Sequence, residues 1–184
     1  SEVGSPVGLF YGYKTDGIYS TTDEALNDGQ YIVLRNGSKL YFKAGDVKFV
    51  STNQDKEINA ADRVVIGNPN PDCYGNLFTN ITVDRVTLSA FFNYSYGNEL
   101  FNYERMILES GSQFYNQTTA MLNRWTTEGQ VTDIPKIAYK DPMGNSRFSD
   151  RWIEDGSYLR LKTVTLSYSL PIHTTYLQGL TFWG

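Results

Sequence analysis

Strict alternation of apolar and polar residues is the feature that most constrains the fold of this chain. It is clearest from Val86 to Tyr96, where every second residue is apolar or aromatic and the residues between them, apart from Phe91, are polar. A period of two over that length predicts a β-strand with one apolar and one polar face. A second run extends from Thr163 to Leu170. Both runs exceed the average globular strand of about 5–6 residues.

Other strands are expected from similar patterns. Tyr74–Thr82 precedes the clearest run, and Val83-Asp84-Arg85 is short enough to join the two as a hairpin. Asn36-Gly37 is the strongest short hairpin signal in the chain. The remaining candidate strands are Gly8–Tyr13, Ile18–Tyr19 after an interruption at Asp16-Gly17, and the pair Gln30–Leu34 and Lys39–Phe42.

The connections between these strands alternate in length. Short turns are expected at Val83–Arg85 and Pro171–His173, whereas residues 20–73 and 97–157 form long excursions. The second excursion lacks alternation over about sixty residues, so it is a large loop or has structure of its own. Within it, helices are expected over Leu100–Leu108 and Asn116–Trp125. Outer-membrane barrels combine short periplasmic turns with long extracellular loops in this way.

Composition narrows the function classes. A single cysteine and a single histidine exclude an internal disulfide framework and the usual zinc sites. A net charge of −4 provides no basic field for nucleic acid. Hydrophobic residues make up 40% of the chain while aromatics reach 15%. No apolar run is long enough for a spanning helix, but tilted transmembrane strands need only about 9–11 alternating residues.

Residues 51–62 follow the frame of a calcium-binding loop. Oxygen-bearing side chains occupy alternating positions, as calcium requires. Lys56 stands where such loops need glycine, and Ser51 stands in place of the first aspartate. The loop is either a calcium site or a polar turn that keeps the shape of such a site without the ion. We expect no required cofactor. The candidate ligands are Ser51, Asn53, Asp55, Glu57, Asn59 and Asp62.

Aromatic residues in the second excursion are candidates for ligand or lid contact, or for packing the loops on one another. They are Tyr103, Tyr115, Trp125, Tyr139 and Trp152. No catalytic residue is expected. The carboxylates Asp46, Asp150, Glu154 and Asp155 show no spacing that demands glycoside hydrolysis, and a Cys73/His173 pair lacks the local signature of a thiol enzyme.

Several blocks together resemble the C-terminal barrel region of SusC/RagA-type TonB-dependent outer-membrane transporters, in matching order along nearly the whole chain. The calcium-like loop departs from the family pattern at Ser51, Gln54 and Lys56. The blocks are Gly8–Tyr19, Gly45–Phe49 leading into residues 51–62, Asp62–Pro71, Leu88–Phe92, Asn123–Thr126 and Asp155–Lys162.

The resemblance implies an all-β fold: residues 1–184 would be an antiparallel segment of a transmembrane barrel of about 22 strands. Its long extracellular loops would contain short helices, and the plug domain and the final strands would lie outside this sequence. It also implies energy-coupled import of glycans or peptides, in the bacterial outer membrane, with a SusD-like lipoprotein closing the mouth. The TonB complex would act through the missing N-terminal part, and neither enzymatic activity nor nucleic acid binding is expected.

The sidedness of the strands follows from this assignment. Val164, Leu166, Tyr168 and Leu170 would face lipid, and the opposite row would line the lumen. About six strands cut from a larger barrel would have no core of their own. The competing hypothesis is a soluble all-β carbohydrate-binding module whose alternating faces pack as a sandwich.

Overall fold

A computed structural model describes every residue of the chain except 1–3, 5 and 171–179. The backbone divides into two units that each make most of their contacts internally. Unit 1 is formed by Ser1–Pro69 and Leu100–Glu154, and unit 2 by Asn70–Glu99 and Asp155–Gly184. The chain therefore enters each unit twice. No described helix has the length and apolar character needed to cross a membrane.

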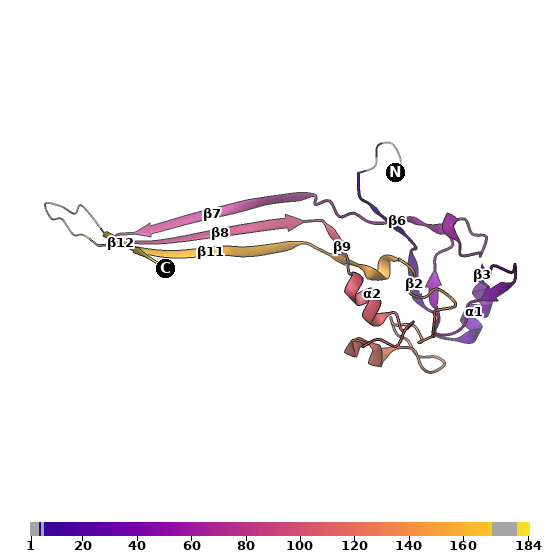
Figure 1. Cartoon of the computed structure of the whole chain (residues 1–184). Helices are drawn as coiled ribbons and strands as arrows, with labels where there is room; N and C mark the ends of the chain where they lie inside the picture. The colour runs from indigo at the N-terminus through magenta and orange to yellow at the C-terminus, as the bar shows by residue number, and fades with distance from the viewer. Residues whose placement is uncertain (1–3, 5, 171–179) are drawn as a thin grey trace. The chain divides into compact units, whose positions relative to one another are not determined.

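Unit 2 is a four-stranded antiparallel sheet, whose strands run side by side in Figure 1. Its strands, in spatial order, are β12 (Leu180–Trp183), β11 (Tyr158–Leu170), β8 (Val86–Tyr96) and β7 (Cys73–Val83). β7 and β8 pair from Cys73 opposite Tyr96 to Val83 opposite Val86, which leaves a tight turn at Asp84 and Arg85. The hairpin predicted from sequence is confirmed. The turn expected at Pro171–His173 lies outside the described residues.

Strand β11 begins earlier than the alternation predicted. Leu161 pairs with Phe92 and Thr163 pairs with Phe91, so Lys162 between them has no partner on β8. This β-bulge resets the phase of the strand, because an extra residue moves the following side chains to the opposite face. The alternating run seen in the sequence is the part of β11 that follows the bulge.

Unit 1 contains short two-stranded pairs. β3–β4 is the hairpin predicted at Asn36-Gly37, with Ile32 opposite Leu40. Asp16 and Gly17 lie inside β2 rather than interrupting it. The pairs are β1 (Phe10–Gly12) with β6 (Val64–Gly67), β2 (Thr15–Ile18) with β5 (Val47–Phe49), β3 (Tyr31–Val33) with β4 (Lys39–Tyr41), and β9 (Glu99–Phe101) with β10 (Ile153–Asp155).

Helices complete unit 1. The helix α2 (Tyr103–Glu109) confirms the expected one, although it starts later because the Asn102 side chain caps it by accepting from Arg105 N at 2.9 Å. The helix expected over Asn116–Trp125 is a shorter 3₁₀ turn, η2 (Thr119–Asn123). Sequence analysis did not predict α1. The other helical segments are α1 (Thr22–Asp28), η1 (Ala60–Asp62) and η3 (Asp150–Trp152).

Unit 1 has a hydrophobic core, contrary to the expectation of none. Aromatic rings make up much of it: Phe42 and Phe49 have ring centroids 5.9 Å apart, and Tyr13 and Phe49 5.7 Å. Every buried hydrophobic residue that the structure describes lies in this unit. The loop segments therefore fold on one another and stabilise themselves by burying apolar area. The cluster consists of Tyr13, Tyr19, Ala25, Ile32, Phe42, Val47, Phe49, Ile58 and Met143.

Candidate functional site

The sheet of unit 2 has one continuous apolar face. Register places Leu88 between Ile81 on β7 and Leu166 on β11, and Val86 beside Tyr168. These side chains are exposed, with 42% of Leu88 and 55% of Leu166 accessible. An exposed apolar surface of this extent marks an interaction or membrane surface. The face comprises Leu77, Ile81, Val83, Val86, Leu88, Phe92, Tyr94, Leu159, Leu161, Val164, Leu166, Tyr168, Leu180 and Phe182.

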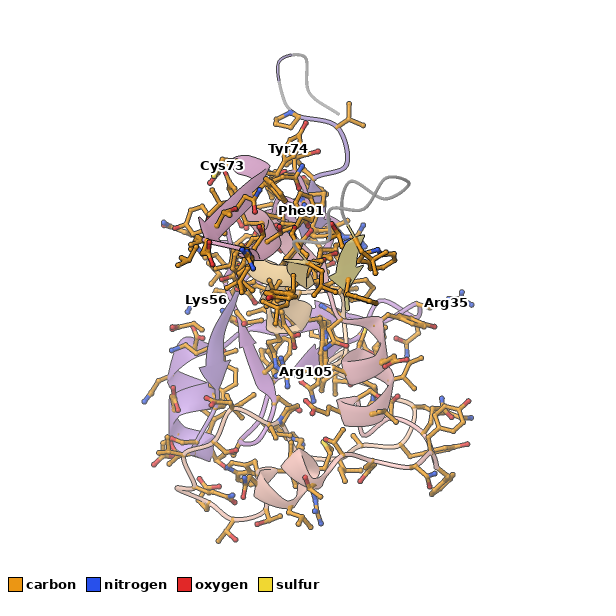
Figure 2. The ribbon with its side chains drawn as sticks, turned by 90° about the vertical axis from the view of Figure 1, so that its left-hand side faces the viewer. Arg35, Lys56, Cys73, Tyr74, Phe91 and Arg105 are labelled. Atoms are coloured by element: carbon orange, nitrogen blue, oxygen red, sulfur yellow. The ribbon has the colours of Figure 1, made fainter. Side chains whose placement is uncertain are left out.

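The opposite face of the sheet carries a ladder of polar side chains. Hydroxyl and amide groups form hydrogen bonds across the strands. The Oγ1 atoms of Thr82 and Thr87 are hydrogen-bonded at 3.0 Å, and Ser89 Oγ donates to Asn80 Oδ1 at 3.0 Å. Asn93 Nδ2 donates to Asn76 Oδ1 at 2.9 Å. Figure 2 labels Phe91, an aromatic residue on this face. The sheet thus has one apolar face and one mainly polar face, on which Phe91 is paired with Phe78.

Three of the aromatic residues proposed for ligand or lid contact are exposed in unit 1. Tyr103 begins α2, Tyr115 lies in the following loop, and Tyr139 lies against Phe114 with ring centroids 5.1 Å apart. Their accessible fractions are 57%, 64% and 56%. Exposed tyrosine rings combine an apolar body with a polar hydroxyl, which suits contact with a ligand or a partner protein. Their contact with a ligand or lid stays a prediction.

The two tryptophans of that set pack inside unit 1. Trp152 is fully buried and its Nε1 donates to Arg147 O at 3.0 Å, so it offers no surface for a ligand or lid, contrary to the expectation. Trp125 donates from Nε1 to Ser20 O at 3.1 Å. Its ring lies so close to Gly45 that a Cβ there would be 2.5 Å away. The alternative that these aromatics pack the loops therefore describes both tryptophans.

The calcium-like loop keeps a curved backbone without the glycines of the family pattern. Gln54 and Lys56 occupy the left-handed region, with φ of 62° and 66°. Lys56 Nζ lies beside Gly29, 3.7 Å from where a Cβ would be, at the C-terminal end of α1. A cation is favourable there because the last carbonyl groups of a helix are partly negative.

Hydrogen bonds within the loop occupy most of its candidate ligand atoms. Asn53 Nδ2 donates to Asp55 Oδ2 at 2.7 Å, and Asp55 Oδ1 accepts from Glu57 N at 2.8 Å. Buried Asp62 accepts from Thr52 N and from Asn59 N, both at 2.9 Å. Calcium needs six to eight oxygens converging on one point. This donor set fits the ion poorly, and calcium binding stays an untested prediction.

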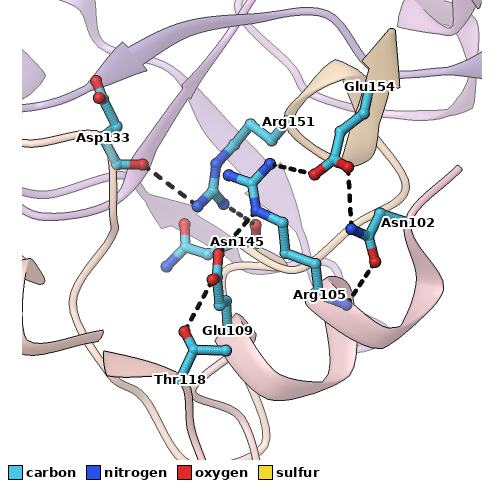
Figure 3. Close-up of polar contacts among 8 residues, drawn as sticks. All are labelled: Asn102, Arg105, Glu109, Thr118, Asp133, Asn145, Arg151 and Glu154. Carbon is cyan, nitrogen blue, oxygen red and sulfur yellow. Dashed lines mark hydrogen bonds and ion pairs between the residues drawn. The ribbon is translucent and has the colours of Figure 1, made fainter. Parts of the chain in front are cut away.

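A polar network fixes α2 within unit 1 (Figure 3). Arg105 donates from Nε to Glu109 Oε2 and from Nη1 to Glu154 Oε1, both at 3.0 Å. A hydrogen bond from Asn102 and the ion pair with Arg105 lower the pKa of Glu154. Thr118 completes the network by donating to Glu109 Oε1 at 2.8 Å. Sequence analysis missed Arg105 and Glu109, although their spacing of four residues is the signal of a helical ion pair.

The candidate catalytic carboxylates have structural partners. Buried Asp46 accepts from Lys136 Nζ and from Asn145 Nδ2, both at 3.0 Å. Asp150 accepts from Thr15 N and Oγ1, and Asp155 accepts from Ser157 N. Cys73 is exposed at the start of β7, whereas His173 lies outside the described residues.

Comparison with known proteins identifies the family. TonB-dependent receptor P3 of Formosa agariphila is 32% identical over 168 residues, which cover 91% of this chain and 16% of that protein. TonB-dependent receptor P26 of the same organism is 29% identical over 178 residues, covering 97% and 17%. No family model matches the chain. The chain matches a segment of TonB-dependent receptors along most of its own length, and spans about a sixth of the length of these relatives.

Solved structures give the fold of the same region. The RagAB peptide transporter superposes with a TM-score of 0.65 at 23% identity, covering 95% of this chain and 18% of that one. The RagAB peptide importer in its closed-closed state gives 0.64 at 22% identity, with the same coverage. The recognition made from sequence blocks and the antiparallel all-β fold class are both confirmed. The relatives are receptors and an importer rather than enzymes, in agreement with the expectation.

Proposed function

We propose that this chain forms part of an outer-membrane importer that takes up glycans or peptides under TonB control. The match to TonB-dependent receptor P3 over 91% of the chain is the observation that carries the proposal. The fold shared with the RagAB peptide transporter supports it. Energy would arrive from the TonB complex through parts of the receptor that this sequence does not include.

The sheet of unit 2 supports the membrane part of this proposal. Its strands β7 and β8 each have 11 residues and β11 has 13, which is enough for the about 9–11 residues that a tilted strand needs to cross a bilayer. The exposed apolar face, with Val164, Leu166 and Tyr168, would contact lipid, and the polar ladder would face the lumen. Lipid would cover surface that in water would favour aggregation.

Unit 1 would lie on the extracellular side, together with the other residues of 20–73 and 97–157. The tight turn at Asp84 and Arg85 would then be periplasmic, as short turns are in such barrels. A folded extracellular unit with exposed Tyr103, Tyr115 and Tyr139 offers a surface for the substrate or for a SusD-like lipoprotein lid. RagAB is named as a peptide transporter, which favours neither a peptide nor a glycan for this chain.

Copurification tests this proposal. Full-length receptor, isolated from outer membranes in detergent, should carry a SusD-like lipoprotein, and mass spectrometry of the complex should identify bound glycan or peptide. Detergent removal provides the control for the competing hypothesis. A receptor region that stays monomeric and fully folded in plain buffer would be a soluble carbohydrate-binding module, and the importer proposal would fail.

A further inference from the structure

Unit 1 contains a pocket of about 270 Å³ that the proposed function does not use. Strand β1 and the residue after it form one wall, and two arginines from distant parts of the chain line the others. The pocket is lined by Tyr11, Gly12, Tyr13, Arg63, Arg147 and Phe148.

Close backbone contacts hold the pocket in shape. Tyr13 N donates to Phe148 O at 3.0 Å, which ties β1 to the loop that carries Arg147. Gly12 permits this approach, because a Cβ there would lie 2.6 Å from Phe148 O. Arg63 follows η1 and precedes β6, the partner strand of β1. The segments beside the two arginines are thus both held against β1 and the residue that follows it.

The two guanidinium groups face the same aromatic ring. Arg63 Cζ lies 5.5 Å and Arg147 Cζ 5.4 Å from the centroid of Tyr13, and Arg147 is also 5.5 Å from Phe49. The Nη1 atom of Arg147 is buried and has no hydrogen-bond partner among the described residues. Burial, and to a lesser degree the charge of Arg63, lower the pKa of Arg147. A buried donor without an acceptor is unfavourable, because it has lost its hydrogen bond to water and gained none in return.

The two carboxylates whose charge acts on Arg147, those of Asp62 and Asp141, are hydrogen-bonded to backbone groups rather than to the arginines. Asp62 accepts from Thr52 N and Asn59 N, and Asp141 accepts from Asn145 N and Ser146 N, each at 2.7 to 2.9 Å. Neither arginine makes an ion pair within the described part of the chain. Positive charge and a free donor therefore remain in the pocket.

We propose that the pocket formed by Arg63 and Arg147 binds the oxyanion of a small solute, either a carboxylate or a sulfate. Guanidinium groups bind both anions with paired hydrogen bonds. The rings of Tyr11, Tyr13 and Phe148 would pack on the body of the solute. The volume suits one acidic sugar or one amino acid rather than a polymer. That the solute is part of the imported nutrient rests on the proposed function; the binding itself does not.

Calorimetric titration of full-length receptor in detergent with sodium sulfate, at constant ionic strength in chloride, tests the proposal. Wild type should bind sulfate, and Arg63→Gln and Arg147→Gln should each weaken binding at least about tenfold, as loss of a charge-assisted bond requires. Arg35→Gln removes the same charge from the exposed β3–β4 turn, where Figure 2 labels it, and should bind as wild type does. Because Arg63 is exposed, its variant folds even where Arg147→Gln does not.

Further arms identify the source of the oxyanion. Galacturonate and N-acetylglutamate, compared with the uncharged analogues galactose and N-acetylglutaminamide, separate an acidic sugar from an acidic amino acid. In crystals, selenate should give anomalous density between the two arginines. Binding of neither sulfate nor the acidic solutes by wild type, equal binding by Arg63→Gln, or a carboxylate of the receptor itself seated between the arginines would overturn the inference. Transport is not measured in any arm, so failure of the import proposal would leave these results unchanged.

Discussion

The two units of this chain place their apolar residues differently, one in an interior and the other on an exposed face. Unit 1 collects its aromatic and aliphatic side chains into an interior, and the largest of them, Trp152, is inaccessible. Unit 2 has a regular sheet and places its apolar residues on an exposed face. Both units contain aromatic and aliphatic residues, and they differ in where these residues lie. Under the proposed function, what differs is the solvent around each unit, water around unit 1 and lipid along one face of unit 2.

Removing a core side chain from unit 1 should have the largest effect. Trp152→Ala loses a fully buried ring and its bond to Arg147 O, and should lower the free energy of unfolding by about 3–5 kcal/mol. The loss is measured by unfolding the receptor in denaturant and using proteolytic cleavage of unit 1 as the readout of its unfolding. Tyr115→Ala, an exposed aromatic of the same unit, should change stability little. Equal effects of the two substitutions would show that the core does not stabilise unit 1.

A charge on the apolar face tests the membrane side of the comparison. Leu166→Arg should cost about 2–4 kcal/mol if the residue lies near the bilayer midplane, whereas Ser167→Arg, on the polar face, should be tolerated. Assembly into outer membranes and the heat needed to unfold the receptor on gels report the difference. Equal tolerance at both positions would contradict the assignment of faces.

Alkaline pH should act on unit 1 through Tyr19. Burial, together with the hydrogen bond that its hydroxyl donates to Asp28, raises the pKa of Tyr19 far above its ordinary value of 10.0. The folded state therefore retains a proton that the unfolded chain loses, so stability present below pH 10 falls as the pH rises above it. Tyr19→Phe should reduce this fall in unfolding measurements between about pH 8 and 11. The exposed Tyr115→Phe should keep the wild-type profile, and a Tyr19→Phe profile identical to wild type would refute the assignment.

Calcium removal should have the smallest effect. We propose that hydrogen bonds within residues 51–62 hold the loop without the ion, so EGTA should shift the thermal midpoint of the receptor by less than about 1 °C. A triple variant with Ser51→Asp, Gln54→Gly and Lys56→Gly restores the family pattern and should gain stability when calcium is added. A midpoint that falls in wild type on chelation would instead show that the loop binds calcium.

The alternation of the sequence predicted the sheet of unit 2 because a strand with one apolar and one polar face has a period of two. Val86–Tyr96 coincides with β8, and the turn after Val83 is where it was expected. The first part of β11 escaped prediction because the bulge at Lys162 breaks the period. In α1, the capping pattern of Thr21 with Glu24, and Gly29 after the last turn, were signals in the sequence that were not used.

The site was less predictable because it depends on contacts between distant segments. Nothing in the sequence shows that Trp152 is covered while Tyr115 is exposed, since both lie in loops rich in aromatics. Arg63 and Arg147 meet at Tyr13 only through the fold. The oxygen pattern of the calcium-like loop, in contrast, is visible in the sequence, but which oxygens are already hydrogen-bonded is not.

The bulge at Lys162 also bears on how members of this family should be aligned. The apolar residues before the bulge and those after it fall on different parities of the sequence. The extra residue places both sets on the same side of the sheet. A relative that lacks the bulge would keep its apolar side continuous only by losing one residue at this point. We therefore expect single-residue gaps between family members to gather at Lys162 rather than within the alternating runs beside it.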